Sequence, residues 1–574
     1  MTGTPSDTSG NVTSGQSGFG PEGVTIVTQS GVPESDLVTV TIDGAQVRVR
    51  KGTNIIEAAR LLGKDIPHYC YHPDLSIAGN CRMCQIQVKG VPRLSIGCNT
   101  GATEGMEVTT QATDSGVVEG QASVLEFILA NHPLDCTVCD QAGHCKLQDY
   151  HYEYNGRPSR FLEDKVHKVK AEPLGPTVML DGERCIMCSR CVRFCDEITG
   201  TSEIGLLNRG DRTVIAVSPD RPLDNPLSGT VVDLCPVGAL THREWRFNSR
   251  IWFSKQTDAI CPGCSTGCNV RVAVRDAHEV VQVKARYNQA VNKEWLCDEG
   301  RYGFGRFLPR DRLTSPSVGG KPVTLTEALR ALPKSSEDEV AIFVAPDLVL
   351  EEYVVLRRFI QARMPRAFVA LAYRERELTS VEKILISPDY AANFRGAQIG
   401  QLFRREEGGE LGGDGSFGEK FLGDRYEMAI RKLRGGVFSR VFFIGERAIA
   451  REDLDAEILS AVQGCQTSLF IGTDKTNPLV STVSVVIPGR SILEKSGLVV
   501  NRGYHLQYTD RVVELPEGTM PEWRVLNEWS TISGGALVPS QNDRELTLGI
   551  LSSEERLKGL RLKDIKAGGV VLAT

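Results

Sequence analysis

The chain has 574 residues, of which 41% are hydrophobic and 24% are charged, and its formal net charge is −6. This length suggests about four domains, the composition is that of a globular protein, and a weakly acidic chain has no general attraction for nucleic acid or membrane surfaces. No stretch approaches the ~18 apolar residues of a spanning helix and the start lacks a secretion-signal pattern, so we expect a soluble protein that reaches membranes only through partners.

Cysteine is the unusual residue of this sequence. Seventeen cysteines are present, and fifteen of them lie between Cys70 and Cys268. Disulfide scaffolds are typical of small secreted domains, whereas this chain is long and shows no secretion signal. Cysteines packed this densely therefore indicate metal-binding sites, with disulfides as the alternative.

The N-terminal part of the chain is predicted to be a tail followed by a small domain. Residues 1–36 are rich in Ser, Gly and Thr, which predicts a disordered tail. In "LVTVTIDGAQVRVRKG", alternating Val and Ile flank Asp43-Gly44, which indicates a β-hairpin. In "TNIIEAARLLG", Thr53 is the predicted N-cap of a helix and Gly63 its stop. Two strands, a helix and a cysteine-bearing loop indicate a mixed α/β unit.

The later elements fall into a cysteine-rich part and a regular part. "QASVLEFILA" predicts a helix, and cysteine-rich loops then continue to about residue 300. Beyond them, "EVAIFVA", "AFVALAY" and "RVFFIG" predict buried strands, and "EEYVVLRRFIQARM" and "REDLDAEILSAVQ" predict helices. This alternation indicates an α/β layer domain. The run "GDGSFG" at residues 413–418 fits G-x-G-x-x-G but follows a polar loop, so we expect no dinucleotide site there.

The first cysteine group has the spacing C-x10-C-x2-C-x13-C and consists of Cys70, Cys81, Cys84 and Cys98. Two thiolates separated by two residues can share one iron, while the distant cysteines hold the other iron of a two-iron cluster. The spacing departs from the plant-type C-x4-C-x2-C. A zinc site, which also takes four thiolates, is the alternative.

The second group, "NHPLDCTVCDQAGHC", has only three cysteines, Cys136, Cys139 and Cys145. The candidates for a fourth ligand are His132, Asp135, Asp140 and His144. A neutral imidazole nitrogen binds iron in some iron–sulfur proteins, whereas a carboxylate oxygen is a harder donor that suits a soft cluster less well. Two histidines therefore remain, and the residues of this segment alone do not choose between them.

The third group, "CIMCSRCVRFC", contains Cys185, Cys188, Cys191 and Cys195. Three thiolates at C-x2-C-x2-C suit three corners of a four-iron cluster, whereas zinc sites usually separate their cysteines into pairs. In ferredoxin-type motifs the fourth ligand often precedes proline, so we predict Cys235 in "DLCPVGAL" as the fourth ligand and Cys195 as a buried thiol beside the site. Arg190 and Arg193 are interpreted as surface charges or, alternatively, as charges that stabilise the reduced cluster.

The fourth group joins "CPGCSTGC" to a later cysteine and consists of Cys261, Cys264, Cys268 and Cys297. Its spacing favours a four-iron cluster, because a zinc ribbon prefers two C-x2-C pairs. Four sites with four ligands each need sixteen side chains, and the groups supply fifteen cysteines. One non-cysteine ligand is therefore needed, and it belongs to the second group. Cys195 and Cys465 remain without an assigned role.

In this order the four groups resemble the large iron–sulfur subunit of respiratory complex I, the NADH:quinone oxidoreductase. "YCYHPDLSIAGNCRMCQIQV", "NHPLDCTVCDQAGHCKLQD" and "ERCIMCSRCVRFCDEITG" carry the resemblance, and "CPGCSTGCNVRV" with "WLCDEGRYGF" is similar to the segment that opens molybdopterin oxidoreductases. The resemblance is strong over about residues 37–316. Beyond them only "ANFRGAQIG" and "EKSGLVVNRGYHLQ" are similar to the molybdopterin-type domain of the family.

The resemblance implies a ligand set for each cluster. It assigns one [2Fe-2S] cluster to Cys70, Cys81, Cys84 and Cys98, and three [4Fe-4S] clusters to His132, Cys136, Cys139 and Cys145, to Cys185, Cys188, Cys191 and Cys235, and to Cys261, Cys264, Cys268 and Cys297. His132 follows from the family's H-x3-C-x2-C-x5-C pattern, although which of its nitrogens binds stays open. The third four-iron cluster lies off the family's electron path.

The resemblance also implies a division of the chain into a disordered tail and five domains. These are a two-iron β-grasp domain at 37–118, a His/Cys-ligated four-iron domain at 119–160, a four-iron ferredoxin-like domain at 161–250, a molybdopterin-oxidoreductase-type four-iron segment at 251–310, and a shortened α/β molybdopterin-oxidoreductase-like domain at 311–574, after the tail at 1–36. Because the part after Cys297 is short for a pterin-binding domain and contains only Cys465, we expect no molybdenum.

The function implied is electron relay within complex I, without an active site in this chain. The expected partners are the flavoprotein subunit that binds FMN and NADH, a small two-iron subunit and the quinone-side subunits of the peripheral arm. The expected location is the cytoplasmic face of the plasma membrane. The alternatives are an electron-transfer or catalytic subunit of an NAD-linked formate dehydrogenase or hydrogenase, and a zinc-bound scaffold.

Overall fold

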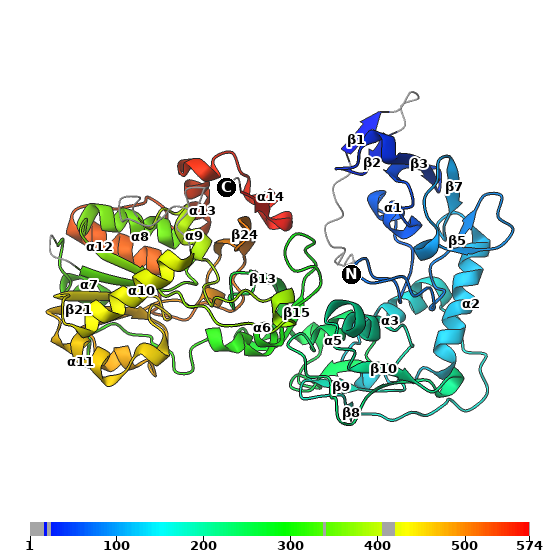
Figure 1. Ribbon diagram of the computed structural model, residues 1–574, viewed down its shortest axis with the longest axis horizontal. Coiled ribbons are helices and arrows are strands. Elements are labelled where there is room, and N and C mark those ends of the chain that lie inside the picture. The colour runs from blue at the N-terminus through cyan, green and yellow to red at the C-terminus, as the bar shows by residue number, and fades with distance from the viewer. Residues whose placement is uncertain (1–15, 20–24, 337–339, 404–418, 573–574) are drawn as a thin grey trace. The chain divides into compact units, whose positions relative to one another are not determined.

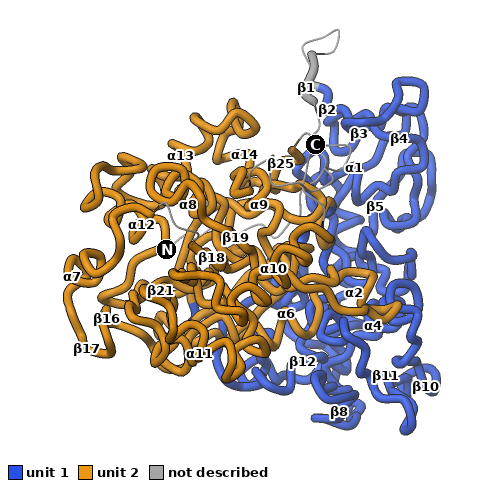
Figure 2. The backbone as a smooth tube through the Cα atoms, turned by 60° about the vertical axis from the view of Figure 1, so that its left-hand side comes forward, with its two compact units in different colours: residues 1–254, 287–289, 293–295 blue, residues 255–286, 290–292, 296–574 orange. Residues whose placement is uncertain are grey.

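The structure is a computed structural model that describes residues 16–19, 25–336, 340–403 and 419–572. The chain forms two compact units, which Figure 2 draws in different colours. Unit 1 consists of residues 1–254 with the segments 287–289 and 293–295, and unit 2 consists of residues 255–286, 290–292 and 296–574. Within the described part of the chain, no helix combines the length and the apolar composition that crossing a membrane requires.

Unit 1 begins with a seven-stranded mixed sheet in the order β1-β2-β4-β3-β7-β5-β6 (Figure 1). Its strands are β1 (Gln16–Phe19), β2 (Thr25–Thr28), β3 (Leu37–Ile42), β4 (Ala45–Arg50), β5 (Gln85–Val88), β6 (Ser95–Ile96) and β7 (Met106–Thr109). β3 pairs antiparallel with β4 and parallel with β7. Helix α1 (Ile55–Leu61) packs Ile55 and Ile56 into one core with Val40 and Val47. This arrangement is the β-grasp fold that the resemblance implies.

The hairpin expected at Asp43-Gly44 is confirmed. Both residues have positive φ, 48° at Asp43 and 79° at Gly44, as in the tight turns that connect antiparallel strands. The Asp43 carboxylate also accepts hydrogen bonds from the Thr110 N–H at 2.7 Å, from Thr113 Oγ1 at 2.6 Å and from Lys64 Nζ at 3.1 Å. The turn therefore ties the hairpin to the residues that follow β7 and α1.

The helix after the hairpin begins one residue later than the sequence predicts. Asn54 is the N-cap in place of Thr53, because Asn54 Oδ1 accepts the Glu57 N–H at 3.0 Å. Thr53 stays in extended chain, since its carbonyl accepts a hydrogen bond from the Ala102 N–H at 2.8 Å. Gly63 lies just beyond the helix end with a φ of 69°, as expected. The helix start therefore depends on a hydrogen bond to Ala102, a residue far away in the sequence. A prediction from the local sequence pattern does not include such a contact.

The prediction of a disordered tail does not hold for the described part of residues 1–36. β2 pairs in parallel with β4, with Val27 opposite Val47, and the Gln29 N–H donates to the Arg48 carbonyl at 2.9 Å. The sequence of this strand is the short β-branched run TIVT. The many Ser and Gly residues around it led to the prediction of disorder. Residues 1–15 and 20–24 lie outside the described residues.

The rest of unit 1 consists of one long helix, α2, and of short elements joined by cysteine-bearing loops. The helix predicted at residues 121–130 is confirmed as part of α2 (Ser115–Asn131), which Asp114 caps. The remaining elements are α3 (Lys146–Tyr150), α4 (Arg190–Arg193), α5 (Thr230–Leu234), the paired strands β10 (Ile204–Leu207) and β11 (Val214–Val217), and a sheet of β12 (Leu240–His242), β9 (Val178–Leu180) and β8 (Glu172–Pro173). Small cysteine-rich regions of this kind draw part of their stability from bound metal.

Unit 2 is built on a second seven-stranded sheet with the order β17-β16-β22-β21-β20-β18-β19. Its strands are β16 (Ser317–Val318), β17 (Lys321–Pro322), β18 (Val340–Val344), β19 (Phe368–Leu371), β20 (Arg440–Ile444), β21 (Thr467–Gly472) and β22 (Val485–Pro488). The run from β22 to β19 is parallel. Two antiparallel sheets accompany it, β13 (Lys255–Ile260) with β14 (Asn269–Arg275) and β15 (Glu279–Ala285), and β23 (Gly497–Val500) with β24 (His505–Thr509) and β25 (Val570–Val571).

Helices cover both faces of the parallel sheet (Figure 1). The helices of unit 2 are α6 (Asp298–Tyr302), α7 (Leu325–Arg330), α8 (Leu350–Arg363), α9 (Phe394–Ile399), α10 (Glu419–Arg434), α11 (Ala456–Gly464), α12 (Glu522–Ser533), α13 (Asp543–Ser553) and α14 (Leu562–Gly568). Along β18, Ile342 and Val344 pack with α8 and α12, whereas Ala341 and Phe343 pack with α10 and α11, because alternate side chains point to opposite faces. The predicted α/β layer domain is confirmed, and residues 413–418 lie outside the described part.

We expect Asp43→Asn to destabilise the β-grasp domain. Burial acts to raise the pKa of Asp43, but hydrogen bonds led by Thr113 outweigh it and lower the pKa below its usual value. The ionised carboxylate therefore stabilises the fold above about pH 4, and this contribution is lost as the pH falls through the folded-state pKa.

The free energy of unfolding should fall by about 2 kcal/mol, and equally at about pH 6 and pH 8, because both lie above the Asp43 pKa in the folded and unfolded states. Denaturant unfolding of the whole chain followed by circular dichroism measures this. The control is Asp36→Asn at an exposed position of the same domain. An equal loss in the control would contradict the expectation.

Candidate metal centres

The first predicted set of cysteines comes together in the β-grasp domain. Cys70 and Cys81 lie in the loop between α1 and β5, Cys84 directly precedes β5, and Cys98 lies in the 3-10 turn after β6. Cys81 is half-buried and the other three are buried. The Cys70 N–H donates to Cys81 Sγ at 3.4 Å. The fold therefore brings together four residues that span the whole cysteine loop.

These four thiols form two hydrogen-bonded pairs. The hydrogen bond between Cys70 and Cys81 lowers the pKa of Cys70 and raises that of Cys81. The bond between Cys84 and Cys98 lowers the pKa of Cys98 and raises that of Cys84. In each pair the hydrogen bond therefore favours the thiolate form of one sulfur, and the thiolate is the form that binds metal. Two pairs of sulfurs fit the two irons of a [2Fe-2S] cluster. The pairs are Cys70 with Cys81 and Cys84 with Cys98, whereas the spacing predicted that Cys81 and Cys84 share one iron.

The second set of cysteines lies between α2 and α3. Cys136 and Cys139 flank a 3-10 turn, and Cys145 is the residue before α3. Burial raises the pKa of Cys145 to about 11, and the sulfurs of Cys139 and Cys136 act on it in the same direction. The three thiols are therefore close neighbours.

His132 directly follows α2 and is half-buried. Its Nδ1 is buried and has no hydrogen-bond partner among the described residues, which fits a nitrogen that binds metal; other buried side chains share this property, so it does not by itself identify the ligand. Burial, together with the charges of Lys165 and Arg184, lowers the pKa of His132 to about 4, so the imidazole is neutral at physiological pH. Arg184 is also an electrostatic neighbour of Cys139, which places His132 and a thiol of this set around one guanidinium.

Two residues from outside this segment shape the second set, and sequence reasoning missed both. Arg184 Nη2 pairs with Asp135 Oδ2 at 3.0 Å. Gly238 lies against Cys139, because a Cβ at position 238 would be 2.1 Å from Cys139 Sγ. Both residues come from the segments that carry the third set, so the second and third sets are neighbours within unit 1. In the sequence, these two residues are marked only by their positions close to Cys185 and Cys235.

The third set gathers around the start of α4. The sulfurs of Cys188, Cys185, Cys235 and Cys195 are all electrostatic neighbours of Cys191. Burial raises the pKa of Cys185, Cys188 and Cys235 to about 11. Backbone N–H groups hydrogen-bond to the sulfur of Cys235, from Val237, Ala239 and Leu240. The fold therefore brings Cys235 to the C-x2-C-x2-C loop across more than forty intervening residues.

Cys195 lies in the helical turn after α4 and is fully buried. Burial raises its pKa to about 12, and its further electrostatic neighbours are Glu203 and Asp196. Two carboxylates beside a thiol disfavour the thiolate that a metal ligand must be. This environment fits a buried thiol beside the site.

Arg190 and Arg193 are buried, with exposed fractions of 8% and 9%, so their interpretation as surface charges is wrong. Arg190 Nη1 donates to the Leu234 carbonyl at 3.3 Å. The sulfur of Cys188 is an electrostatic neighbour of both guanidinium groups. The two positive charges therefore lie within the cysteine-bearing core of unit 1.

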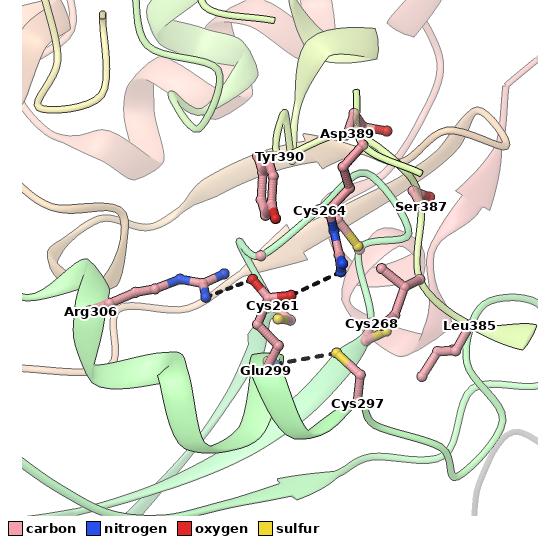
Figure 3. Close-up of a pocket in the computed structure, with 15 residues that line it drawn as sticks. Cys261, Cys264, Cys268, Cys297, Glu299, Arg306, Leu385, Ser387, Asp389 and Tyr390 are labelled. Carbon is pink, nitrogen blue, oxygen red and sulfur yellow. Dashed lines mark hydrogen bonds and ion pairs between the residues drawn. The ribbon is translucent and has the colours of Figure 1, made fainter. Parts of the chain in front are cut away.

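The fourth set lines a pocket in unit 2 (Figure 3). Cys261, Cys264 and Cys268 lie in the loop between β13 and β14, and Cys297 directly precedes α6. The pocket encloses ≈ 390 Å³ including space open to solvent. The Gly300 N–H donates to Cys297 Sγ at 3.3 Å. A Cβ at Gly300 would lie 3.2 Å from the sulfurs of both Cys261 and Cys297, so the glycine leaves room for the sulfurs.

Residues of the C-terminal part hold this fourth loop in place. Asp389 accepts hydrogen bonds from Ser265 Oγ at 2.5 Å and from the Ser265 N–H at 3.1 Å. Glu299 pairs with Arg306 at 2.8 Å and with Arg376 at 3.2 Å (Figure 3). The sheet domain of unit 2 therefore supports the loop that carries the cysteines.

The residues at all four places fit iron–sulfur clusters. Buried thiolates need positive charge close to them, which the irons of a cluster supply, and amide donors to sulfur are a usual part of such sites. Among the described residues, no three His, Cys, Asp or Glu side chains converge to bind a single metal ion. In a cluster, each iron takes only one protein ligand in the [4Fe-4S] form or two in the [2Fe-2S] form, so no three ligands need to converge on one ion.

Four segments of the chain match families of iron–sulfur proteins. Residues 35–113 match a 2Fe-2S iron-sulfur cluster binding domain, residues 121–160 the NADH-ubiquinone oxidoreductase-G iron-sulfur binding region, residues 175–241 the ferredoxin-like domain of NADH-quinone oxidoreductase subunit 3, and residues 254–307 the molybdopterin oxidoreductase Fe4S4 domain. The chain therefore contains both [2Fe-2S] and [4Fe-4S] binding domains, in the order of the four ligand sets.

The G subunit of NADH-quinone oxidoreductase from Streptomyces coelicolor is 37% identical over 402 residues, which are 68% of this chain and 47% of that protein. The chain is a relative of the NADH-quinone oxidoreductase G subunits. The mitochondrial NADH dehydrogenase [ubiquinone] iron-sulfur protein 1 of Solanum tuberosum is 40% identical over 286 residues, 50% of this chain and 38% of that protein. This relative of the G subunits thus spans about half the length, or less, of the curated proteins it matches.

A solved chain of an NAD+-reducing [NiFe]-hydrogenase in the H2-reduced state is also similar to this chain. It is 29% identical, the match covers 37% of this chain and 91% of that chain, and the TM-score is 0.34. A superposition at this score is too poor to compare the folds.

We expect Gly238→Ala to damage the second metal site selectively. The new methyl group would collide with Cys139 Sγ, and a displaced thiolate no longer fits its iron. The purified variant should contain about four fewer irons per chain than the unchanged protein. The control is Gly205→Ala, where a Cβ meets no atom within 4 Å, and it should keep its iron. A Gly238→Ala variant with full iron content would contradict the close contact.

Proposed function

We propose that the chain is an iron–sulfur electron-transfer subunit of the peripheral arm of an NADH:quinone oxidoreductase. It relays electrons that come from NADH, through a flavoprotein subunit, toward quinone. The observation that carries the proposal is the meeting of four ligand sets, each within a segment that matches an iron–sulfur family. No side chain of this subunit is needed as a general acid, base or nucleophile.

The proposed ligands follow the four sets. Cys70, Cys81, Cys84 and Cys98 hold a [2Fe-2S] cluster, and three [4Fe-4S] clusters are held by His132, Cys136, Cys139 and Cys145, by Cys185, Cys188, Cys191 and Cys235, and by Cys261, Cys264, Cys268 and Cys297. The electrostatic contacts among the thiols of each set support this assignment. The buried, unpartnered Nδ1 of His132 supports the imidazole as sixteenth ligand.

When bound, such clusters take up and release single electrons at fixed positions. The protein holds the thiolates, excludes water from most of them by burial, and directs N–H groups at their sulfurs. Buried positive charge from Arg190 and Arg193 lies beside the third set. These features favour the reduced state, because it carries additional negative charge.

The proposed partners are a flavoprotein subunit that binds FMN and NADH, a small two-iron subunit and the quinone-side subunits of the peripheral arm. Through them the chain would lie at the cytoplasmic face of the plasma membrane. We propose no molybdenum site, because only Cys465 follows Cys297 in the described residues and it lies against Phe438 and Ala461, whose carbonyls accept its S–H at 3.5 Å and 3.4 Å.

Anaerobic purification of the whole chain from native membranes tests this function. We expect about fourteen irons with matching acid-labile sulfide per chain, and co-purification of a flavoprotein and of quinone-side subunits. Stoichiometric zinc in place of iron would contradict the clusters, and stoichiometric molybdenum would favour a catalytic role. Formate-oxidising or hydrogenase partners would move the chain to another electron-transfer complex.

We expect His132→Cys to keep a cluster and to lower its midpoint potential, because a thiolate in place of a neutral imidazole makes the site more negative. Redox titration followed by electron paramagnetic resonance measures the potential. His144→Ala in the same segment is the matched control and should leave both the signal and the potential unchanged. Loss of the signal in His144→Ala, with an unchanged potential in His132→Cys, would make His144 the ligand.

A further inference from the structure

The loop of the first ligand set is attached to the helix of the third ligand set by buried hydrogen bonds that the proposed function does not explain. The loop residues are 70–80 and the helical residues are 187–197, and all of them belong to unit 1. Arg193, between the ligands Cys191 and Cys235 of the third set along the chain, is the centre of this attachment. Its guanidinium is buried, with an exposed fraction of 9%.

Arg193 joins the two sets directly. Its Nη2 donates to the carbonyl of Cys70 at 2.6 Å and to the carbonyl of Cys188 at 3.4 Å. Its Nη1 donates to the carbonyl of Ser76, further along the same loop. One guanidinium therefore contacts the backbone of a ligand of the first set and of a ligand of the third set, and the rigid fork of an arginine suits such a bridge.

Other contacts hold the same two segments together. Arg190 donates from Nη2 to the carbonyl of Tyr71, next to Cys70, and from Nη1 to that of Leu234 at 3.3 Å. Asn80 Nδ2 donates to the Met187 carbonyl at 3.1 Å. These bonds surround Arg193, so its position is determined from several sides.

Arg193 also acts electrostatically on the two cysteine sets, because charged groups of both lie near it. Its electrostatic neighbours include the sulfurs of Cys188 and Cys70 and the carboxylate of Glu197. Glu197 is exposed and accepts the Ser76 N–H at 2.8 Å. A buried cation acts on nearby charges through a low local dielectric, whereas an exposed one is screened by water and salt. The guanidinium therefore acts on both sulfur sets.

We propose that Arg193 is a positioning residue shared by the two-iron site and the four-iron site of the third set. It fixes the Cys70 loop against the Cys188 turn, and its charge raises the midpoint potentials of both sites together. Arg193 itself exchanges neither electrons nor protons. The inference rests on the proposed function, because it requires clusters at these two ligand sets.

The test is redox titration of the whole purified chain, with each cluster followed by its electron paramagnetic resonance signal. Arg193→Gln removes the charge and should shift both midpoint potentials to more negative values, while the His132 site shifts less. Arg193→Lys keeps the charge without the fork, so its shifts should be smaller. The matched control is Arg82→Gln, which removes the same charge beside Cys81 at an exposed position, where water and salt screen it, and should shift both sites clearly less than Arg193→Gln.

Glu197→Gln distinguishes an electrostatic effect of Arg193 on the midpoint potentials from an effect of a loosened loop. It removes a negative neighbour of Arg193 and retains one oxygen that can accept the Ser76 N–H, while the new amide N–H can donate to Ser76 Oγ in place of the bond that this hydroxyl now donates. Both potentials should therefore shift slightly upward. Loosening of the loop alone would move both variants in the same direction. Hydrogen–deuterium exchange of residues 69–77 reports the attachment independently, and it should be faster in Arg193→Gln than in Arg82→Gln.

Each outcome decides the inference. Unchanged potentials in Arg193→Gln with full iron content would overturn it, and so would shifts of equal size in Arg82→Gln. If Arg193→Gln loses its clusters, the opposite shifts expected of Arg193→Lys and Glu197→Gln decide in its place. Failure of the proposed function is distinct, because it would appear in the unchanged protein as absence of iron.

Discussion

Burial of sulfur ligands is the constraint on which the rest of this structure depends. A thiolate that leaves water must be compensated by positive charge and hydrogen bonds, and most of the proposed ligands are buried. Iron supplies most of the charge in a cluster, and the protein supplies the remainder. Apart from α2, the elements of unit 1 that follow the β-grasp sheet are short, and cysteine-bearing loops join them.

The protein meets this constraint with contacts between segments that are distant in sequence. Arg184 and Gly238 belong to the segments of the third set and shape the second set, and Arg193 belongs to the third set and contacts the first. The surroundings of each of these sites in unit 1 therefore include a residue from the segment that carries another set. In unit 2, the domain that contains the parallel sheet holds the cysteine loop in place, because Asp389 accepts two hydrogen bonds from Ser265 of that loop.

Much of this organisation could be predicted from residue type and spacing. The pairs and triplets of cysteines defined four groups, and the count of cysteines required one additional ligand. The predictions of the Asp43-Gly44 turn, of the helix at 121–130 and of three strands of the parallel sheet, β18, β19 and β20, were correct. Each depends on a local pattern: a turn-forming residue pair, helical periodicity or a buried β-branched run. Each of the four segments that match an iron–sulfur family contains one of these cysteine groups.

The sequence by itself determined which residues could bind metal, because ligand chemistry and close spacing are local properties. Only the tertiary structure decided what surrounds them. Arg190 and Arg193 carry charged side chains, which are usually exposed. The fold nevertheless buries both of them between two cysteine sets. Pairing with Ala102 moved the N-cap from Thr53 to Asn54. Burial, charge compensation and close packing depend on residues far apart in the chain, and a single sequence contains no record of which distant segments meet.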